Sequence, residues 1–189
     1  MRDVICARRV MAQWLAPTLA IPMSPSSPDP SISSEAIWRP HVTVACVVHR
    51  HGRFLMVEED VRGQVLFNQP AGHLDPGETL LQAACRETLE ETGWEVEPRA
   101  FIGVRQYDST QHGSHIVRFA FAAEPLRHHP DRPLDHGVLR AHWLEYDEIA
   151  ALGERLRSPL VLATLDDWLA GSRWSLSLVG DGIATRGER

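Results

Sequence analysis

The stretch that most restricts how this chain can fold is residues 72–94, GHLDPGETLLQAACRETLEETGW. It opens with a loop that contains two glycines and a proline. Thr79 and Gln82 have the spacing of a capping box, which predicts that a helix begins there. Gly93 is typical of the residue that follows the last turn of a helix. The stretch therefore predicts a tight loop followed directly by one helix.

Three glutamates of this helix, Glu87, Glu90 and Glu91, are spaced i, i+3 and i+4 and so share one face. The stretch contains no lysine that could pair with them. Like charges at this spacing repel one another, and a divalent cation would remove the repulsion. Oxygen ligands suit Mg²⁺, or else Mn²⁺. A solvated acidic face remains the alternative reading of these residues.

The remainder of the chain mixes strand patterns with short helical ones. Strands are predicted within 41–48, 53–59, 65–70, 100–109, 115–124 and 138–146, and the first two form a hairpin. A short helix is predicted at 147–153, and another begins with Ser158 as N-cap and Pro159 at the first turn. Hairpins outnumber regular βαβ units, so we expect an α/β sandwich with a mixed β-sheet between helices.

An apolar content of 43% over 189 residues suits one globular domain, which we place at 39–171. Residues 1–38 include a proline- and serine-rich segment and are expected to form a disordered extension. A signal peptide is the less favoured alternative, because prolines interrupt the apolar part. Residues 172–189 are polar and are expected to be a loose tail.

Net charge, hydropathy and cysteine content indicate which binding partners and which cellular compartment to expect. The net charge of -6 disfavours a nucleic-acid polymer, and no apolar run is long enough to span a membrane. The three cysteines, Cys6, Cys46 and Cys85, have no CxxC spacing. Cys46 and Cys85 have apolar neighbours and are expected to be reduced, buried thiols, so we expect a cytoplasmic protein. A monomer and a homodimer both remain open.

The charged residues and glycines of the opening stretch resemble the Nudix box, G-x5-E-x7-R-E-U-x-E-E-x-G-U, where U is a bulky apolar residue. The matching residues are Gly72, Glu78, Arg86, Glu87, Glu90, Glu91, Gly93 and Trp94. Thr88 occupies the first U position and is less apolar than the pattern. The chain is thus similar to the Nudix hydrolase family, which implies hydrolysis of a diphosphate linked to another group, X.

The resemblance also implies roles for these residues. Glu87, Glu90 and Glu91 would hold Mg²⁺ together with the Gly72 carbonyl, and one glutamate would accept a proton from the attacking water. Arg86 belongs to the same catalytic set. Arg86 and Glu78 are expected to pair and hold the loop against the helix.

Three further segments, HVTVACVV, FNQPAGHLDPGETL and LRSPLV, look like the NudJ-type phosphatases of that family. This likeness implies a small phosphorylated metabolite as substrate: nucleoside di- and triphosphates, and thiamine-type pyrophosphates. One alternative is a house-cleaning pyrophosphatase for damaged nucleotides or a nucleotide sugar. Another is a nucleotide sensor without turnover, which an intact set of Arg86 and glutamates disfavours.

Several residues outside the box are candidates for contact with substrate. Substrate-binding candidates are Gln69, Arg105, Arg118 and Arg157, with His112 and His115 as further phosphate ligands. Aromatic residues that could stack on a ring are Phe67, Tyr107 and Trp143, whereas Trp94 is expected in the core. Asp135 and Glu124 could supply an extra metal ligand or base, and His128 and His129 are expected to be loop residues.

Overall fold

The computed structural model describes residues 38–109, 114–180 and 182. The predicted N-terminal extension lies outside the described residues except for Trp38, and so does the end of the chain. In order, the elements are β1 (His41–Arg50), β2 (Arg53–Val61), β3 (Gln64–Asn68), β4 (Ala71–His73), α1 (Leu80–Thr92), β5 (Trp94–Ser109), β6 (Ser114–His128), β7 (Val138–Leu144), α2 (Tyr146–Ala150), η1 (Gly153–Arg155), α3 (Leu160–Leu169) and η2 (Leu176–Leu178).

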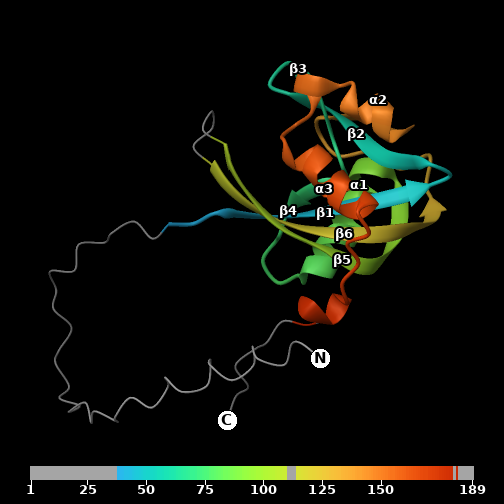
Figure 1. Ribbon diagram of the computed structural model, residues 1–189. Coiled ribbons are helices and arrows are strands. Elements are labelled where there is room, and N and C mark those ends of the chain that lie inside the picture. Colours follow the sequence, from blue (N-terminus) through green and yellow to red (C-terminus); the bar gives the residue numbers. More distant parts are fainter. Residues whose placement is uncertain (1–37, 110–113, 181, 183–189) are drawn as a thin grey trace, which may run out of the picture. The chain divides into compact units, whose positions relative to one another are not determined.

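The described strands form one seven-stranded mixed sheet with the order β3-β2-β1-β6-β5, in which β4 pairs with β1 and β7 with β2 (Figure 1). β1 and β6 run parallel, and the other pairs are antiparallel. The predicted hairpin of β1 and β2 is confirmed, but these strands pair only at His49–Phe54 and Arg50–Arg53. They then diverge, and β4 takes the place of β2 along β1. This divergence opens the sheet next to β4.

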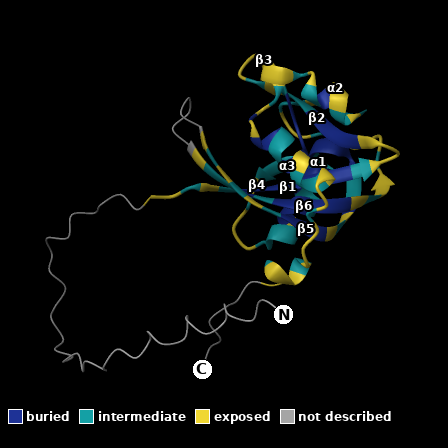
Figure 2. Cartoon of the chain, viewed as in Figure 1, coloured by how far each residue is buried: buried dark blue, intermediate teal, exposed yellow. Residues whose placement is uncertain are grey.

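The core has two parts because β1 alternates its side chains between the two faces of the sheet. Val44, Cys46 and Val48 pack with Ala83 and Ala84 of α1 on one face. On the other face, the side chain of Val47 joins a cluster that includes Ile149 of α2, and Val161 and Leu165 of α3. Figure 2 shows these central strands as buried. The predicted sandwich of a mixed sheet between helices is confirmed.

The helix α1 begins and ends where the sequence predicts. The Thr79 hydroxyl accepts the Gln82 N–H at 3.2 Å, and the Gln82 side chain accepts the Thr79 N–H at 2.8 Å. Gly93 ends the helix with a left-handed φ of 70°. Thr88 is fully buried, but its hydroxyl donates to the Ala84 carbonyl at 2.8 Å. This hydrogen bond explains how a threonine can stand at an apolar position of the motif.

Two sequence-based expectations need correction. Ser158 does not cap α3: the cap position is Pro159, and the Ser158 hydroxyl is buried without a hydrogen-bond partner. The segment after residue 172, expected to be loose, is attached to the sheet as far as η2, because Trp174 exchanges two backbone hydrogen bonds with Phe101. Leu176 of η2 packs against the core on the α1 face. Within the described part of the chain, no helix has the length and apolar character needed to cross a membrane.

Candidate functional site

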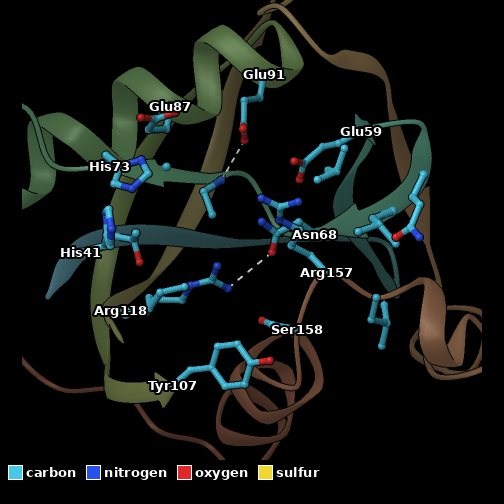
Figure 3. A pocket seen from close by; sticks show the side chains of 18 of the residues that line it. His41, Glu59, Asn68, His73, Glu87, Glu91, Tyr107, Arg118, Arg157 and Ser158 are labelled. Atoms are coloured by element: carbon cyan, nitrogen blue, oxygen red, sulfur yellow. Dashed lines mark hydrogen bonds between the residues drawn. The ribbon is translucent and has the colours of Figure 1, made fainter. Parts of the chain in front are cut away.

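The gap between the diverging strands contains a cavity of about 880 Å³ (Figure 3). Its walls come from β1 and β4, from β2 and β3, from α1, from β5 and β6, and from the segment between η1 and α3. A cavity of this size is typical of sites for small molecules. It brings together segments that are far apart in the sequence.

The α1 wall carries two buried carboxylates. Glu91 is 8% exposed, and its Oε2 accepts the Ala71 N–H of β4 at 2.8 Å. Burial raises the pKa of Glu91 to about 9, and nearby Glu59, Glu87 and Asp135 add to the rise while the Ala71 N–H opposes it. The pKa of Glu87 is also raised by burial, although Arg86 counteracts this. Without a cation, both side chains therefore hold a proton more tightly than an exposed glutamate.

The loop backbone at Gly72 lies directly against Glu87. A Cβ atom added at Gly72 would overlap the Glu87 carboxylate. A larger residue at position 72 would therefore force the Glu87 carboxylate out of its place in the cavity wall. This contact gives a physical reason for the glycine that begins the motif.

Arg86 ties the loop to the helix, as predicted. Its guanidinium donates two hydrogen bonds to Glu78, at 3.0 and 2.7 Å, and one to the His73 carbonyl at 3.0 Å. It also donates to Glu87 at 2.8 Å and to Glu90 at 3.0 Å. The Glu78 hydrogen bonds are the main reason that the pKa of Arg86 is raised, so its charge is permanent.

The structure thus separates the three glutamates. Glu87 and Glu91 line the cavity, whereas Glu90 does not and is bound to Arg86. Helix geometry places the three on one side, as the sequence predicts. Arg86 Nη1 donates to both Glu87 and Glu90, so Glu90 stays near Glu87 but does not line the cavity.

The opposite wall is basic. Arg118 of β6 is only 5% exposed, and burial lowers the pKa of its guanidinium to about 10. Its one hydrogen bond within the described part of the chain, to the Asn68 side chain, is long at 3.4 Å. Arg157 and Glu59 line the same region of the cavity, and Figure 3 shows both beside Asn68.

Two other substrate-binding candidates lie away from the cavity. Arg105 forms a bidentate ion pair with Asp167 of α3, with both distances 2.7 Å. The Gln69 amide is buried and donates to the Val161 carbonyl at 2.7 Å, which ties the loop to α3. His112 lies outside the described residues.

Of the aromatic candidates, only Tyr107 lines the cavity. Phe67 is buried, and Trp143 packs edge-on against Trp94 at 5.7 Å. The remaining candidates have other partners: His115 lies 3.6 Å from Asp108, Glu124 pairs with Arg99, His128 stacks on Trp94, His129 contacts Glu95, and the Asp135 N–H donates to the Glu90 carbonyl.

Sequence reasoning missed several cavity residues, namely His41, Thr43, Glu59, Asn68, His73 and Ser158. Glu59 illustrates the reason. β2 is buried on both faces from Phe54 to Val57, so alternation does not distinguish Glu59 from its acidic neighbours Glu58 and Asp60. In the folded sheet Glu59 pairs with Leu66 of β3, and both residues line the cavity.

The carboxylate oxygens at this site are ligands of the kind that a hard divalent cation prefers. Glu87 and Glu91 offer buried carboxylate oxygens, and Glu59 Oε1 is buried in the same cavity without a hydrogen-bond partner. Among the described residues, no three or more His, Cys, Asp and Glu side chains are already gathered into a metal-binding group. The oxygens are therefore of the right kind, and Glu90 would have to leave Arg86 to join them.

Comparison with known proteins identifies the family. The NUDIX domain model matches residues 39–165, more than half of the chain. The chain belongs to the Nudix family. Proteins named Phosphatase NudJ from Escherichia coli K12 and from Shigella flexneri are each 43% identical to this Nudix protein over 148 residues, which cover 77% of this chain and 94% of each relative.

A solved structure supports the same assignment. The NUDIX hydrolase from Nitrosomonas europaea superimposes with a TM-score of 0.74 at 41% identity, covering 76% of this chain and 98% of that one. The Nudix protein described here is therefore a hydrolase that acts on phosphoric anhydrides of small phosphorylated compounds. Enzymes of this family generally use a divalent metal.

Proposed function

We propose that this Nudix hydrolase removes phosphate from nucleoside di- and triphosphates and from thiamine-type pyrophosphates, with Mg²⁺ or Mn²⁺ as cofactor. The observation that carries the proposal is the cavity, in which buried carboxylates of α1 face a buried guanidinium. The 43% identity to phosphatases named NudJ, over almost their whole length, supports the substrate class.

Glu87 and Glu91 would hold the cation, with the Gly72 carbonyl beside them and Glu90 as a further ligand. A bound divalent cation would neutralise phosphate oxygens and lower the pKa of a bound water. Arg86 positions the Glu87 carboxylate through the 2.8 Å hydrogen bond, and its contacts with Glu78 keep the loop in place. A mispositioned carboxylate would be expected to slow the reaction strongly.

Other cavity residues could accept the proton of the attacking water and contact the ring of the substrate. The Ala71 N–H holds the Glu91 carboxylate in the cavity wall, where it could also accept a proton from the attacking water. Tyr107 and Ile116, which are neighbours in the β5–β6 register, supply an apolar wall for a nucleobase or a thiazole-like ring.

A substrate panel tests this proposal. Compare kcat/KM for thiamine pyrophosphate, GDP, GTP and ADP-ribose with saturating Mg²⁺, and identify the product as orthophosphate or pyrophosphate. We expect the first three compounds to exceed ADP-ribose and to release orthophosphate. A preference of more than tenfold for ADP-ribose would refute the substrate class, and pyrophosphate release would favour the house-cleaning pyrophosphatase.

A further inference from the structure

Unpaired polar atoms are concentrated in this cavity. Six buried side-chain N or O atoms of the described residues have no hydrogen-bond partner, and four of them belong to residues that line the cavity: Thr43 Oγ1, Glu59 Oε1, Arg118 Nε and Ser158 Oγ. Folded proteins pair the large majority of such atoms, so each exception needs an explanation. Three of these four can donate a hydrogen bond, which indicates a ligand rich in acceptors.

The position of Arg118 follows from strand alternation. On β6, Ala122 and Ala120 face the α3 side of the core, and Arg118 is the next residue on that face. The register of the parallel pair places Thr43 of β1 directly beside Arg118. A guanidinium and a hydroxyl, both buried and both with unpaired donors, are therefore cross-strand neighbours where the core face becomes the cavity floor.

The third donor comes from a different element. Ser158 is 9% exposed and stands just before the N-terminus of α3, where helix geometry provides free N–H groups and a partial positive charge. The Arg157 N–H donates to the Phe67 carbonyl at 2.8 Å, which fixes this segment against β3. The Arg157 side chain lines the cavity as a second guanidinium.

We propose that Thr43, Arg118, Arg157 and Ser158 form a phosphate cradle that binds one phosphate of the substrate without a metal ion, next to the wall formed by Glu87 and Glu91. The inference rests on the proposed function for the identity of the substrate. It adds that the two phosphates of a diphosphate are held differently, one by the cation and the other by hydrogen-bond donors of the chain.

Charge and acceptor count favour phosphate over a neutral group. Two guanidiniums, Arg118 and Arg157, line this region, and the carboxylates that act on Arg118 are Glu59 and Glu91. The unpaired Oε1 of Glu59 can accept the proton of a monoprotonated phosphate. A tetrahedral oxyanion also satisfies several donors that converge from different directions.

Inorganic phosphate tests the cradle without turnover. Its affinity for the metal-free, full-length protein is measured by calorimetry in the presence of EDTA. Thr43→Val and Thr164→Val are a matched pair, because both remove a buried hydroxyl that has no partner, but only Thr43 lines the cavity. We expect Thr43→Val to weaken phosphate binding about tenfold and Thr164→Val to leave it unchanged.

Arg118→Met removes the buried charge, and we expect it to weaken phosphate binding by about a hundredfold or more. If this variant does not fold, the matched threonine pair decides alone. The cradle would be overturned if the wild-type protein bound no phosphate at phosphate concentrations up to about 10 mM, which would mean a Kd weaker than the millimolar range. So would equal binding by the two threonine variants.

The cradle and the proposed function can fail separately. Phosphate binding that depends on Thr43 and Arg118, in a protein that hydrolyses none of the panel compounds, would keep the cradle and refute the function. Hydrolysis of the panel compounds without such phosphate binding would refute the cradle alone.

Discussion

Replacement of Glu91 by glutamine should stabilise the metal-free protein at neutral pH. Glu91 is 8% exposed, and burial raises its pKa from 4.5 to about 9. Glutamine has nearly the same shape, and its carbonyl oxygen can still accept the Ala71 N–H. The substitution therefore removes the ionisable group and keeps the hydrogen bond that joins α1 to β4.

The size of the effect follows from proton linkage. Between pH 4.5 and 9, the unfolded chain has lost the proton of Glu91 whereas the folded chain keeps it. The contribution of this group to stability is fully present below pH 4.5 and declines as the pH rises, by about 1.4 kcal/mol per pH unit for one proton. From pH 5 to pH 7 the wild-type protein should lose about 2–3 kcal/mol through Glu91 alone, or roughly 5–10 °C in Tm.

Urea unfolding in EDTA at pH 5 and pH 7 measures this loss. Other acids, including Glu59 and Glu87, also have raised pKa values, so the comparison between wild type and Glu91→Gln isolates the contribution of Glu91. We expect the variant to gain about 2–3 kcal/mol over the wild type on going from pH 5 to pH 7. An identical pH dependence in the two proteins would show that Glu91 is not a buried, protonated carboxyl group in the metal-free state.

Two other substitutions test the geometry around Arg86 and Gly72. Gly72→Ala should lower turnover by about a hundredfold and stability by about 1–3 kcal/mol, because the new Cβ would overlap the Glu87 carboxylate; Gly103→Ala is the control, since a Cβ there meets no atom within 4 Å. Equal effects of the two glycine changes would contradict this account. Arg86→Lys should keep the positive charge but lose the paired hydrogen bonds of the guanidinium that join Glu78 to the helix. We expect kcat to fall at least about tenfold. A wild-type kcat in this variant would show that the charge alone is sufficient.

Local spacing made much of the α1 side predictable. Thr79, Gln82 and Gly93 define the ends of the helix through contacts a few residues apart, and the structure confirms each of them. The pairing of Arg86 with Glu78 depends on the same short loop. These interactions could be predicted because they need no knowledge of how distant segments meet.

The opposite wall depends on strand register and could not be predicted in the same way. Arg105 and Arg118 are direct partners in the β5–β6 register and were equal candidates from sequence. Arg105 forms an ion pair with Asp167 of α3, whereas Arg118 makes no hydrogen bond to a carboxylate of the described residues and lines the cavity. Which of the two lines the cavity is decided by the position of α3, and neither arginine's neighbouring sequence predicts that position.

The most direct test of the account is the rate of GDP hydrolysis as a function of Mg²⁺ concentration, measured for the wild type and for the single substitutions Glu87→Gln, Glu90→Gln and Glu91→Gln. We predict no turnover in EDTA and a rise with Mg²⁺ in the wild type. Glu87→Gln and Glu91→Gln should lose about a hundredfold or more in kcat at saturating Mg²⁺, since they remove cavity carboxylates that would act on the transition state. A similar loss of kcat in Glu90→Gln would indicate that Glu90 leaves Arg86 to join the cation, whereas wild-type kcat would indicate that it stays with Arg86. Wild-type turnover in both Glu87→Gln and Glu91→Gln, or full activity in EDTA, would contradict the assignment of this cavity as a metal-dependent active site.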